Sequence, residues 1–378
     1  MKKHNLLFLL LLLINNSLIN CSFQISLFNK LNEKQKNLTI SPISIFLALS
    51  LVSNGASGET LKELLVLLDN KNLDEINEIN SKLLSKIKEI SSPEIANAIM
   101  TKLSPLPKFS KIAKDNYFSE IQPLKGAKQI NKWCDKKTHG KIKEIIDKVE
   151  DDIYMIILNA VYFKGEWEEQ FKKELTTKKI FYNFNSDSNR KNVDMMKITK
   201  YFSYFEDSNL QAVKLPYKKD SMSALILLPK KDLNINEFVD LLDKDNEYIY
   251  SIIKNFKYNK VNLELPKFEI TYTKSLKEVL KNMGVKLAFE VKADFSNIRS
   301  QNDLMIDEII HKTYLKVNEE GTEAAAVTMI SMKLTSMAPQ FEMIYYMIVN
   351  RPFLFILRNE EFPKYHDIIF ISKIEEIN

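Results

Sequence analysis

The segment from Glu319 to Thr328 constrains the fold of this chain more than any other stretch of the sequence. It reads Glu-Glu-Gly-Thr-Glu-Ala-Ala-Ala-Val-Thr and follows Tyr314–Val317, a run with the composition of a β-strand. Alanines in series usually favour a short surface helix. Small and β-branched side chains also suit an exposed segment that later enters a packed sheet, because they lower the steric barrier and fit a strand. The segment therefore indicates a sheet that can gain a strand.

The remaining composition indicates one large continuous domain, which we expect over residues 22–378. Length alone would allow two or three domains in a chain of 378 residues. However, the 7 glycines and 11 prolines are spread along the chain, and no linker or repeat divides it. The formal net charge of +5 falls to +3 when Lys2 and Lys3 are removed, which is too small to indicate nucleic-acid binding.

Residues 1–21 have the form of a secretory signal peptide. A basic start precedes the apolar run Leu6–Ile14, whose nine residues are far fewer than the roughly 20 that a membrane-spanning helix needs. Cleavage is expected after one of three residues, Ser17, Cys21 or Ser22. No later segment is long and apolar enough to cross a bilayer, so we expect a secreted, extracellular protein without a membrane anchor.

Cysteine usage agrees with a core that needs no disulfide. If Cys21 leaves with the signal peptide, Cys134 is alone, and its helical surroundings predict a half-buried thiol. The run ending at Cys21 comes near a bacterial lipoprotein box, but Asn20 stands where a small residue belongs. Asn37 begins an Asn-Leu-Thr sequon and is a candidate glycosylation site. An apolar helix follows directly, so burial could prevent the modification.

Hydrophobic patterns predict an α+β fold with large sheets, because helices gather early in the chain and strands gather late. Three helices are expected: one entered through Ser41 and Pro42, one capped by Thr60, and one over Asp74–Ile90. The expected strands include a long buried one, and are Tyr154–Phe163, Ala212–Pro216, Ser223–Leu228, Val261–Pro266, Phe353–Leu357 and Ile368–Ile371.

Catalytic patterns are nearly absent. Three of the four histidines lie beyond the signal peptide, and none has metal-ligand spacing with Cys or a carboxylate. The sequence has no Gly-rich phosphate loop and no Gly-x-Ser-x-Gly turn. Cys134 and His139 are five residues apart, which is poor register for one helical face. We therefore expect a protein that is not an enzyme and that needs no cofactor or metal.

Several further stretches resemble serpin motifs, in the order in which that family has them. They are Asn37–Ser44 with Gly55–Thr60, Ile130–Trp133 with Thr138–Ile142, Asn159–Trp167, Leu265–Phe268 and Arg351–Phe355. Together with the segment Glu319–Thr328 they identify the chain, by resemblance over about residues 23–374, as a member of the serpins. Three features depart from the family pattern: Ser372 replaces a Gly, Asp194 replaces a Pro, and the stretch from Pro339 to Pro352 is longer than usual.

The resemblance implies a serpin fold: helices packed on three β-sheets, an exposed reactive-centre loop at about 319–340, and a metastable native state. It also implies a suicide mechanism, in which a serine protease cleaves the loop and the acyl-enzyme is trapped as the loop inserts into the main sheet. Two alternatives remain open. The chain could be a non-inhibitory relative, such as a carrier, storage protein or chaperone, or a cross-class inhibitor of papain-like cysteine proteases.

The resemblance also assigns residues to three parts of this mechanism. The hinge of the loop comprises Glu319, Gly321, Thr322, Glu323, Ala324, Ala325, Ala326, Val327 and Thr328. A polar cluster called the shutter, under the strands that must part, comprises Ser41, Ser44, Asn159 and His311. The breach, where the loop first enters the sheet, comprises Trp167, Lys267 and Glu319, with an exposed Lys267–Glu319 pair expected.

The target follows from a count along the loop. The family's spacing from Glu319 predicts cleavage between Thr335 and Ser336, which suits an elastase-like protease. A slip to Lys333 would instead suit trypsin-like enzymes, and Leu334 would suit papain-like ones. We expect a monomer whose partner is a protease. Lys136, Lys137, Lys141 and Lys143 form a candidate site for a sulfated polysaccharide that would modulate it.

Overall fold

The computed structural model describes residues 23–34, 36–69, 72–90, 93–322 and 343–378. The expected signal peptide, the hinge from Glu323 onward and the candidate bonds at 333–336 lie outside these residues. Among the described residues, no helix combines the length and apolar character that crossing a membrane requires.

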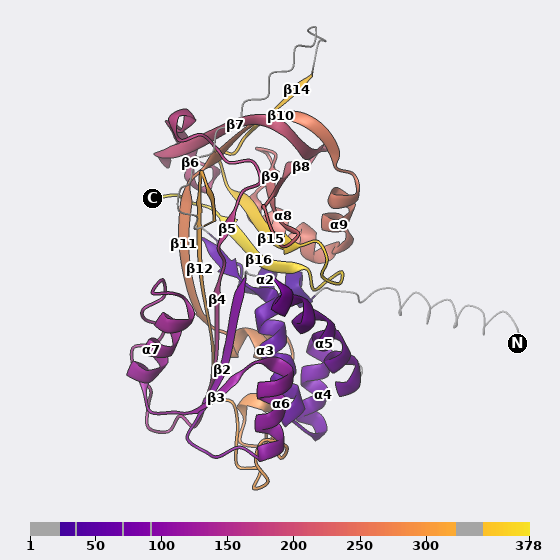
Figure 1. The fold of residues 1–378 in the computed structure, drawn as a ribbon, viewed down its shortest axis with the longest axis vertical. Helices are drawn as coiled ribbons and strands as arrows, with labels where there is room; N and C mark the ends of the chain where they lie inside the picture. The colour runs from indigo at the N-terminus through magenta and orange to yellow at the C-terminus, as the bar shows by residue number, and fades with distance from the viewer. Residues whose placement is uncertain (1–22, 35, 70–71, 91–92, 323–342) are drawn as a thin grey trace, which may run out of the picture.

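The helices of the first part of the chain pack together beside the lower half of the molecule (Figure 1). At their centre is α3 (Pro42–Gly55), which is buried along almost its whole length and begins with Pro at its first turn. Thr60 does not cap the next helix as expected, because that helix begins at Gly58, and the Thr60 hydroxyl instead accepts a hydrogen bond from the backbone of Asp294. Around α3 lie α2 (Phe23–Leu31), α4 (Gly58–Leu67), α5 (Leu73–Glu89) and α6 (Pro107–Tyr117).

A seven-stranded sheet forms the long axis of the molecule (Figure 1). Its order is β3 (Glu120–Pro123), β2 (Glu94–Thr101), β4 (Met155–Tyr162), β12 (Glu308–Asn318), β13 (Gly321–Thr322) and β5 (Gly165–Glu166), with β11 (Phe268–Ser275) paired to β12. All eight residues of β4 are buried, because α3 covers one face of the sheet and α7 (Ala127–Lys137) covers the other. This double cover explains why β4 is apolar along its length except at Asn159.

A nine-stranded sheet fills the upper half (Figure 1). It comprises β1 (Leu38–Ile40), β16 (Ile368–Ile374), β15 (Phe353–Asn359), β9 (Met222–Pro229), β8 (Leu210–Pro216), β7 (Arg190–Glu206), β10 (Lys257–Pro266) and β14 (Ile344–Ile348), with β6 (Thr177–Tyr182) on β7. The described strands thus pair into two sheets, not the expected three. The reason is that β7, with 17 residues, pairs with β6, β10 and β8 and so links these strands into one sheet.

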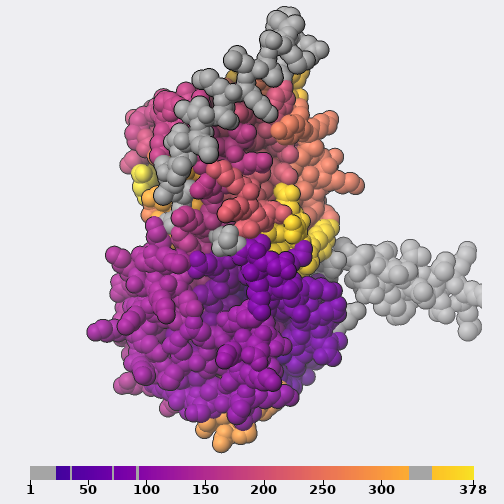
Figure 2. Space-filling view, in the orientation of Figure 1, coloured from indigo at the N-terminus to yellow at the C-terminus, as the bar shows by residue number. Residues whose placement is uncertain are grey.

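The smaller helices α8 (Ile235–Lys244), α9 (Glu247–Lys254) and α10 (Lys277–Asn282) complete the fold. In Figure 2 the earlier residues, indigo to magenta, form most of the lower half of the visible face, with an orange segment of later residues at its tip, and later residues form most of the upper half. The lower half therefore holds the helical support of the main sheet, and the upper half holds the strands that flank the loop.

The sequence departures leave the strands regular. Ser372 pairs with Thr39 on one side and Phe355 on the other, although its hydroxyl is buried with no partner among the described residues. Asp194 lies within β7 and forms an ion pair of 3.0 Å with Lys178. Both substitutions are therefore compatible with regular strand geometry at these positions.

Candidate functional site: the gap between strands β4 and β12

The seven-stranded sheet is closed along most of β4 and β12 and divided at its upper end. From Glu308 to Tyr314, β12 pairs directly with β4 in parallel register, ending opposite Tyr162. Beyond Tyr162 the chain of β4 continues into β5, and here β13 lies between β5 and β12, antiparallel to both. The sheet is therefore one strand wider at this end than below it.

The turn that brings β13 into the sheet requires glycine. At Gly321 a Cβ atom would lie 2.0 Å from the carbonyl oxygen of Gly165, a backbone atom that has no room to move. Gly165 is itself tightly surrounded, since a Cβ atom there would lie 2.6 Å from the Phe163 ring. Two glycines on facing strands thus allow the backbones to approach closely.

Aromatic side chains fix the entry point. The Trp167 indole N–H donates to the carbonyl of Asn318 at 3.0 Å, and its ring stacks on Tyr217 with 4.3 Å between ring centroids. The Tyr217 and Thr322 hydroxyls are hydrogen-bonded at 2.7 Å, and Thr322 is fully buried. Sequence reasoning found Trp167 but missed Tyr217, which lies in a strand turn that carries no signal of its own.

The expected pair between Lys267 and Glu319 is present, but it is not exposed. The two side chains lie 3.2 Å apart, and Glu319 is only 5% exposed. Burial acts to raise the pKa of Glu319, but hydrogen bonds from its own backbone N–H, Thr176 and Lys267 outweigh burial and hold that pKa below its ordinary value. A second pair that the sequence did not indicate joins Lys173 to Glu320 at 2.6 Å. The hinge turn is therefore anchored by two carboxylates.

The shutter residues meet below this point. His311 accepts a hydrogen bond at Nε2 from the backbone N–H of Ser41 at 3.1 Å, so its proton is on Nδ1, which donates to the Asn159 side-chain oxygen. The Asn159 amide donates in turn to the Ser44 hydroxyl and to Asn97. Burial lowers the pKa of His311 to about 3, so the ring is neutral.

Two details of the shutter differ from expectation. Ser41 takes part through its backbone, and its hydroxyl is buried with no partner among the described residues. Asn97 of β2 is an additional member, because it faces Asn159 directly across the β2–β4 pairing. A polar residue inside an otherwise apolar strand was the only available signal for Asn97.

The family model for serpins, described as serine protease inhibitor, matches residues 18–377. The chain belongs to the serpin family. It is 31% identical to intracellular coagulation inhibitor 2 of Tachypleus tridentatus, over 94% of this chain and 89% of that protein. The native-state structure of tengpin, a thermophilic serpin, has 30% identity and a TM-score of 0.84, covering 96% of this chain and 94% of tengpin. Human thyroxine-binding globulin is also similar in structure, with 25% identity, a TM-score of 0.83, and coverage of 96% of this chain and 98% of that chain.

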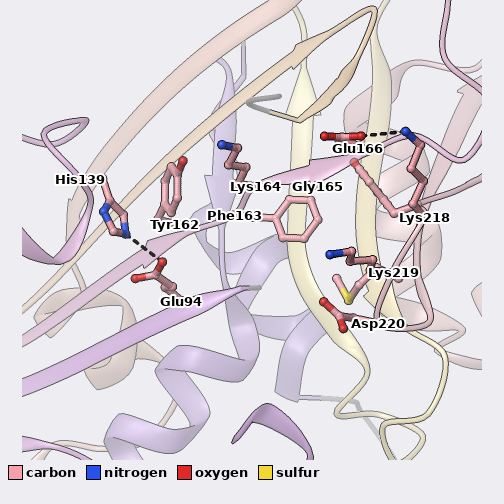
Figure 3. A pocket seen from close by; sticks show the side chains of 12 residues that line it. Glu94, His139, Tyr162, Phe163, Lys164, Gly165, Glu166, Lys218, Lys219 and Asp220 are labelled. Carbon is pink, nitrogen blue, oxygen red and sulfur yellow. Dashed lines mark hydrogen bonds and ion pairs between the residues drawn. The ribbon is translucent and has the colours of Figure 1, made fainter. Parts of the chain in front are cut away.

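A pocket of about 760 Å³ lies beside the breach of this serpin, with Phe163 and Tyr217 among its lining (Figure 3). Two pairs of its polar groups are in contact: the His139 ring lies 2.8 Å from Glu94, and Lys218 lies 2.7 Å from Glu166. The structure does not bring His139 to Cys134, which is fully buried and whose pKa is raised by burial to about 12. The thiol is therefore more buried than expected, and it is unreactive.

The remaining candidate sites have competing partners. Of the four lysines, Lys137 pairs with Glu120 at 2.6 Å and Lys141 lies over the Tyr314 ring, while Lys136 and Lys143 are exposed. The Asn37 amide donates to the carbonyl of Glu376, and its oxygen accepts two backbone N–H groups. This engagement weighs against glycosylation of the folded chain. No group of three His, Cys, Asp or Glu side chains able to hold a metal occurs among the described residues.

Proposed function

We propose that this serpin is a secreted protease inhibitor that traps its target by inserting the cleaved loop between β4 and β12. The observation that supports this most is β13: Gly321 and Thr322 already occupy the first positions of an added strand, and β4 and β12 pair directly below them. A strand that continues β13 must separate β12 from β4. Insertion of a strand into a sheet is a known mode of peptide recognition.

The register of β13 predicts where each loop residue goes. Thr322 lies opposite Val317 of β12 and Gly165 of β5. Six residues further on, Thr328 would lie opposite both His311 and Asn159, which are partners of each other in the closed sheet. Thr328 would therefore enter the shutter and replace the hydrogen bond between its two central residues with bonds to its own hydroxyl.

The faces of the inserted strand follow from the alternation of side chains. Because Thr322 faces the buried side, Ala324 faces that side too, between Leu315 and Phe163. Glu323 faces the other side, between Lys316 and Lys164, where its carboxylate meets two positive charges. Glu323 would therefore point away from the buried side of the inserted strand.

The energy of insertion is sufficient to drive the change. The segment from Thr322 to Thr335 has 14 residues and would span roughly 46 Å as a strand. About a dozen new ladder hydrogen bonds at about 1 kcal/mol each, together with side-chain burial, give on the order of 10–20 kcal/mol.

The decisive experiment mixes the full chain with elastase, trypsin and a papain-type protease. An inhibitor forms a covalent complex that survives SDS, and the cleaved chain becomes more stable to heat. The matched variants Ala324→Glu and Ala325→Glu test the register, because they place the same charge on opposite faces. Ala324→Glu should be cleaved without complex formation, whereas Ala325→Glu, which faces the side of Lys141 and Tyr314, should still trap the protease.

The alternative is a non-inhibitory serpin, and the similarity to thyroxine-binding globulin is the observation in its favour. That alternative predicts that every protease cleaves the loop and departs, with neither variant behaving differently from the natural chain. Cleavage without complex formation across the whole panel would overturn the proposed inhibition.

The target is proposed to be a serine protease of elastase-like specificity that cuts between Thr335 and Ser336. Mass spectrometry of the released C-terminal peptide identifies the bond directly. A peptide beginning at Leu334 would move the target to trypsin-like enzymes. The main pocket of papain-like proteases reads the residue preceding the cleavage position, so Leu334 would attract them to the same bond, and the papain-type protease would then release a peptide beginning at Ser336. Secretion is tested in the same preparation, because the N-terminus of chain recovered from the medium should lie after Ser17, Cys21 or Ser22.

A further inference from the structure

One side of the nine-stranded sheet carries exposed aromatic side chains close to where the loop ends. Tyr201, Tyr258 and Tyr346 are 44%, 73% and 63% exposed, respectively. They belong to three neighbouring strands, β7, β10 and β14. Figure 1 places these strands together at the upper end of the molecule.

The register places these side chains on one face of the sheet. Tyr201 is the partner of Lys260, which is two residues from Tyr258 and therefore on the same side of β10. Tyr346 is the partner of Asn262, again two residues along β10. The opposite face of β14 is closed, since Met347 is fully buried.

Single exposed apolar residues need no explanation, but a contiguous patch usually marks an interaction surface. The Tyr201 and Tyr258 rings are already stacked, with 5.6 Å between centroids and 23° between planes. The patch continues along β14, where Ile348, two residues from Tyr346 and on the same face, is 42% exposed. Rigid tyrosines lose little conformational entropy on binding and often dominate protein interfaces.

We propose that Tyr201, Tyr258 and Tyr346 form a docking surface for the body of the target protease, outside its active-site cleft. The argument is continuity: β14 begins two residues after residue 342, so an enzyme that holds the loop lies against this end of the molecule. The surface rests on the proposed function, because it names a second contact with the same partner. It would set the rate at which that protease is captured and so favour it over others of the same loop specificity.

The test compares the double variant Tyr201→Ser, Tyr258→Ser with the natural chain against elastase, trypsin and a papain-type protease. The association rate constant for the protease captured fastest should fall roughly tenfold, with the number of inhibitor molecules used per complex and the thermal stability unchanged. Tyr154→Ser is the matched control, because Tyr154 is 48% exposed and lies directly before β4. It is thus at the opposite end of β4 from Tyr162, where that strand leads into β5. Its rate should equal that of the natural chain.

Three outcomes would overturn this docking surface. Rates within twofold of the natural chain would show that the tyrosines make no contact with the protease. An equal loss for every protease would show that they act on the loop of their own chain. A change in sedimentation with the double variant would assign the face to a second copy. If no protease forms a complex, the proposed function fails, but the docking surface can still be tested. The kcat/KM for cleavage of the loop in the intact chain is then compared with the kcat/KM for cleavage of a free peptide of residues 323–342.

Discussion

The breach lies between β12 and β5 and the shutter lies between β12 and β4, and the two regions are held together with different chemistry. At the breach the sheet already contains β13, and two buried carboxylates, Glu319 and Glu320, are held by lysines. At the shutter the sheet is closed, and a neutral network around His311 and Asn159 links both strands to α3. Charge pairs at the surface end suit a place where water remains available. A fully buried contact has to be neutral, because an uncompensated charge there is expensive.

For the proposed insertion, this difference predicts that the sheet opens from the breach downward. The breach needs no strand separation for its first step, since Gly321 and Thr322 are in place. In the proposed insertion, the hydrogen bond between His311 and Asn159 would have to be exchanged before Thr328 could pass between them. We therefore expect the breach to control where insertion begins and the shutter to control how far it proceeds.

The largest effect is expected from Gly321→Ala, which abolishes the pre-inserted strand. A Cβ atom 2.0 Å from the carbonyl of Gly165 forces β13 out of the sheet, at a cost of at least about 3 kcal/mol in thermal unfolding. Gly284→Ala is the control, since nothing lies within 4 Å of a Cβ atom there, although its positive φ adds local strain. Equal melting temperatures for the two variants would contradict the close approach.

A smaller effect is expected from Asn159→Ala, which breaks the shutter. The change removes the hydrogen-bond partner of His311 Nδ1 and of the Asn97 side-chain oxygen and should cost about 1–3 kcal/mol. On mild heating the variant should form polymers by loop insertion between molecules, seen on native gels. Asn192→Ala, at an exposed position of β7, should remain monomeric under the same heating; a monomeric Asn159→Ala variant would remove the shutter role.

Glu319→Gln should have a smaller effect on stability and a clear effect on rate. Lys267 is 38% exposed, and solvent weakens its pair with Glu319, so the loss is expected to be about 1–2 kcal/mol. Conversion to an inactive latent form or polymer should become faster, as followed by loss of protease trapping over time. Glu269→Gln, which removes the exposed pair with Lys316, is the control. Identical conversion rates would show that the breach pair does not restrain insertion.

Acidification is expected to have the smallest effect near neutral pH. It should destabilise the shutter and the breach over different pH ranges. The folded pKa of His311 is about 3 against an ordinary 6.5, so below pH 6.5 the unfolded chain binds more protons. Stability should then fall by about 1.4 kcal/mol per pH unit at most, until the folded chain also binds a proton near pH 3. Glu319, whose folded pKa is lowered, contributes stability above its unfolded pKa of 4.5 that is lost only at lower pH. The shutter should therefore weaken first.

Unfolding in denaturant between pH 7.5 and pH 5 measures this order. His311→Gln should reduce the slope in that range. His366 is also buried, with a pKa lowered to about 4, and it contributes to the slope in the same direction. The comparison variant is therefore His366→Gln, which removes the contribution of His366 and retains that of His311. A slope unchanged by His311→Gln would contradict the neutral shutter.

Much of the fold was predictable from local patterns. The run Tyr154–Phe163 indicated a central strand, which the structure has at Met155–Tyr162, and Asp74–Ile90 indicated a helix, which it has at Leu73–Glu89. Trp167, Lys267 and Glu319 were assigned together through the family resemblance, and they lie together. Tyr217, Asn97 and Lys173 were not predicted, because each comes from a distant segment with no signal beyond its own residue type.

The sequence by itself determined the order of helices and strands and the small-residue segment after Gly321. Periodicity, caps and residue size are local properties, and they can be read without knowing the neighbours. Only the tertiary structure decided that Glu319 is buried, that β7 pairs with β6, β8 and β10 in one sheet, and that Thr322 lies opposite Val317 while His311 lies opposite Asn159. Burial and register depend on which distant strands pair, and that choice is made by the packing of the whole core.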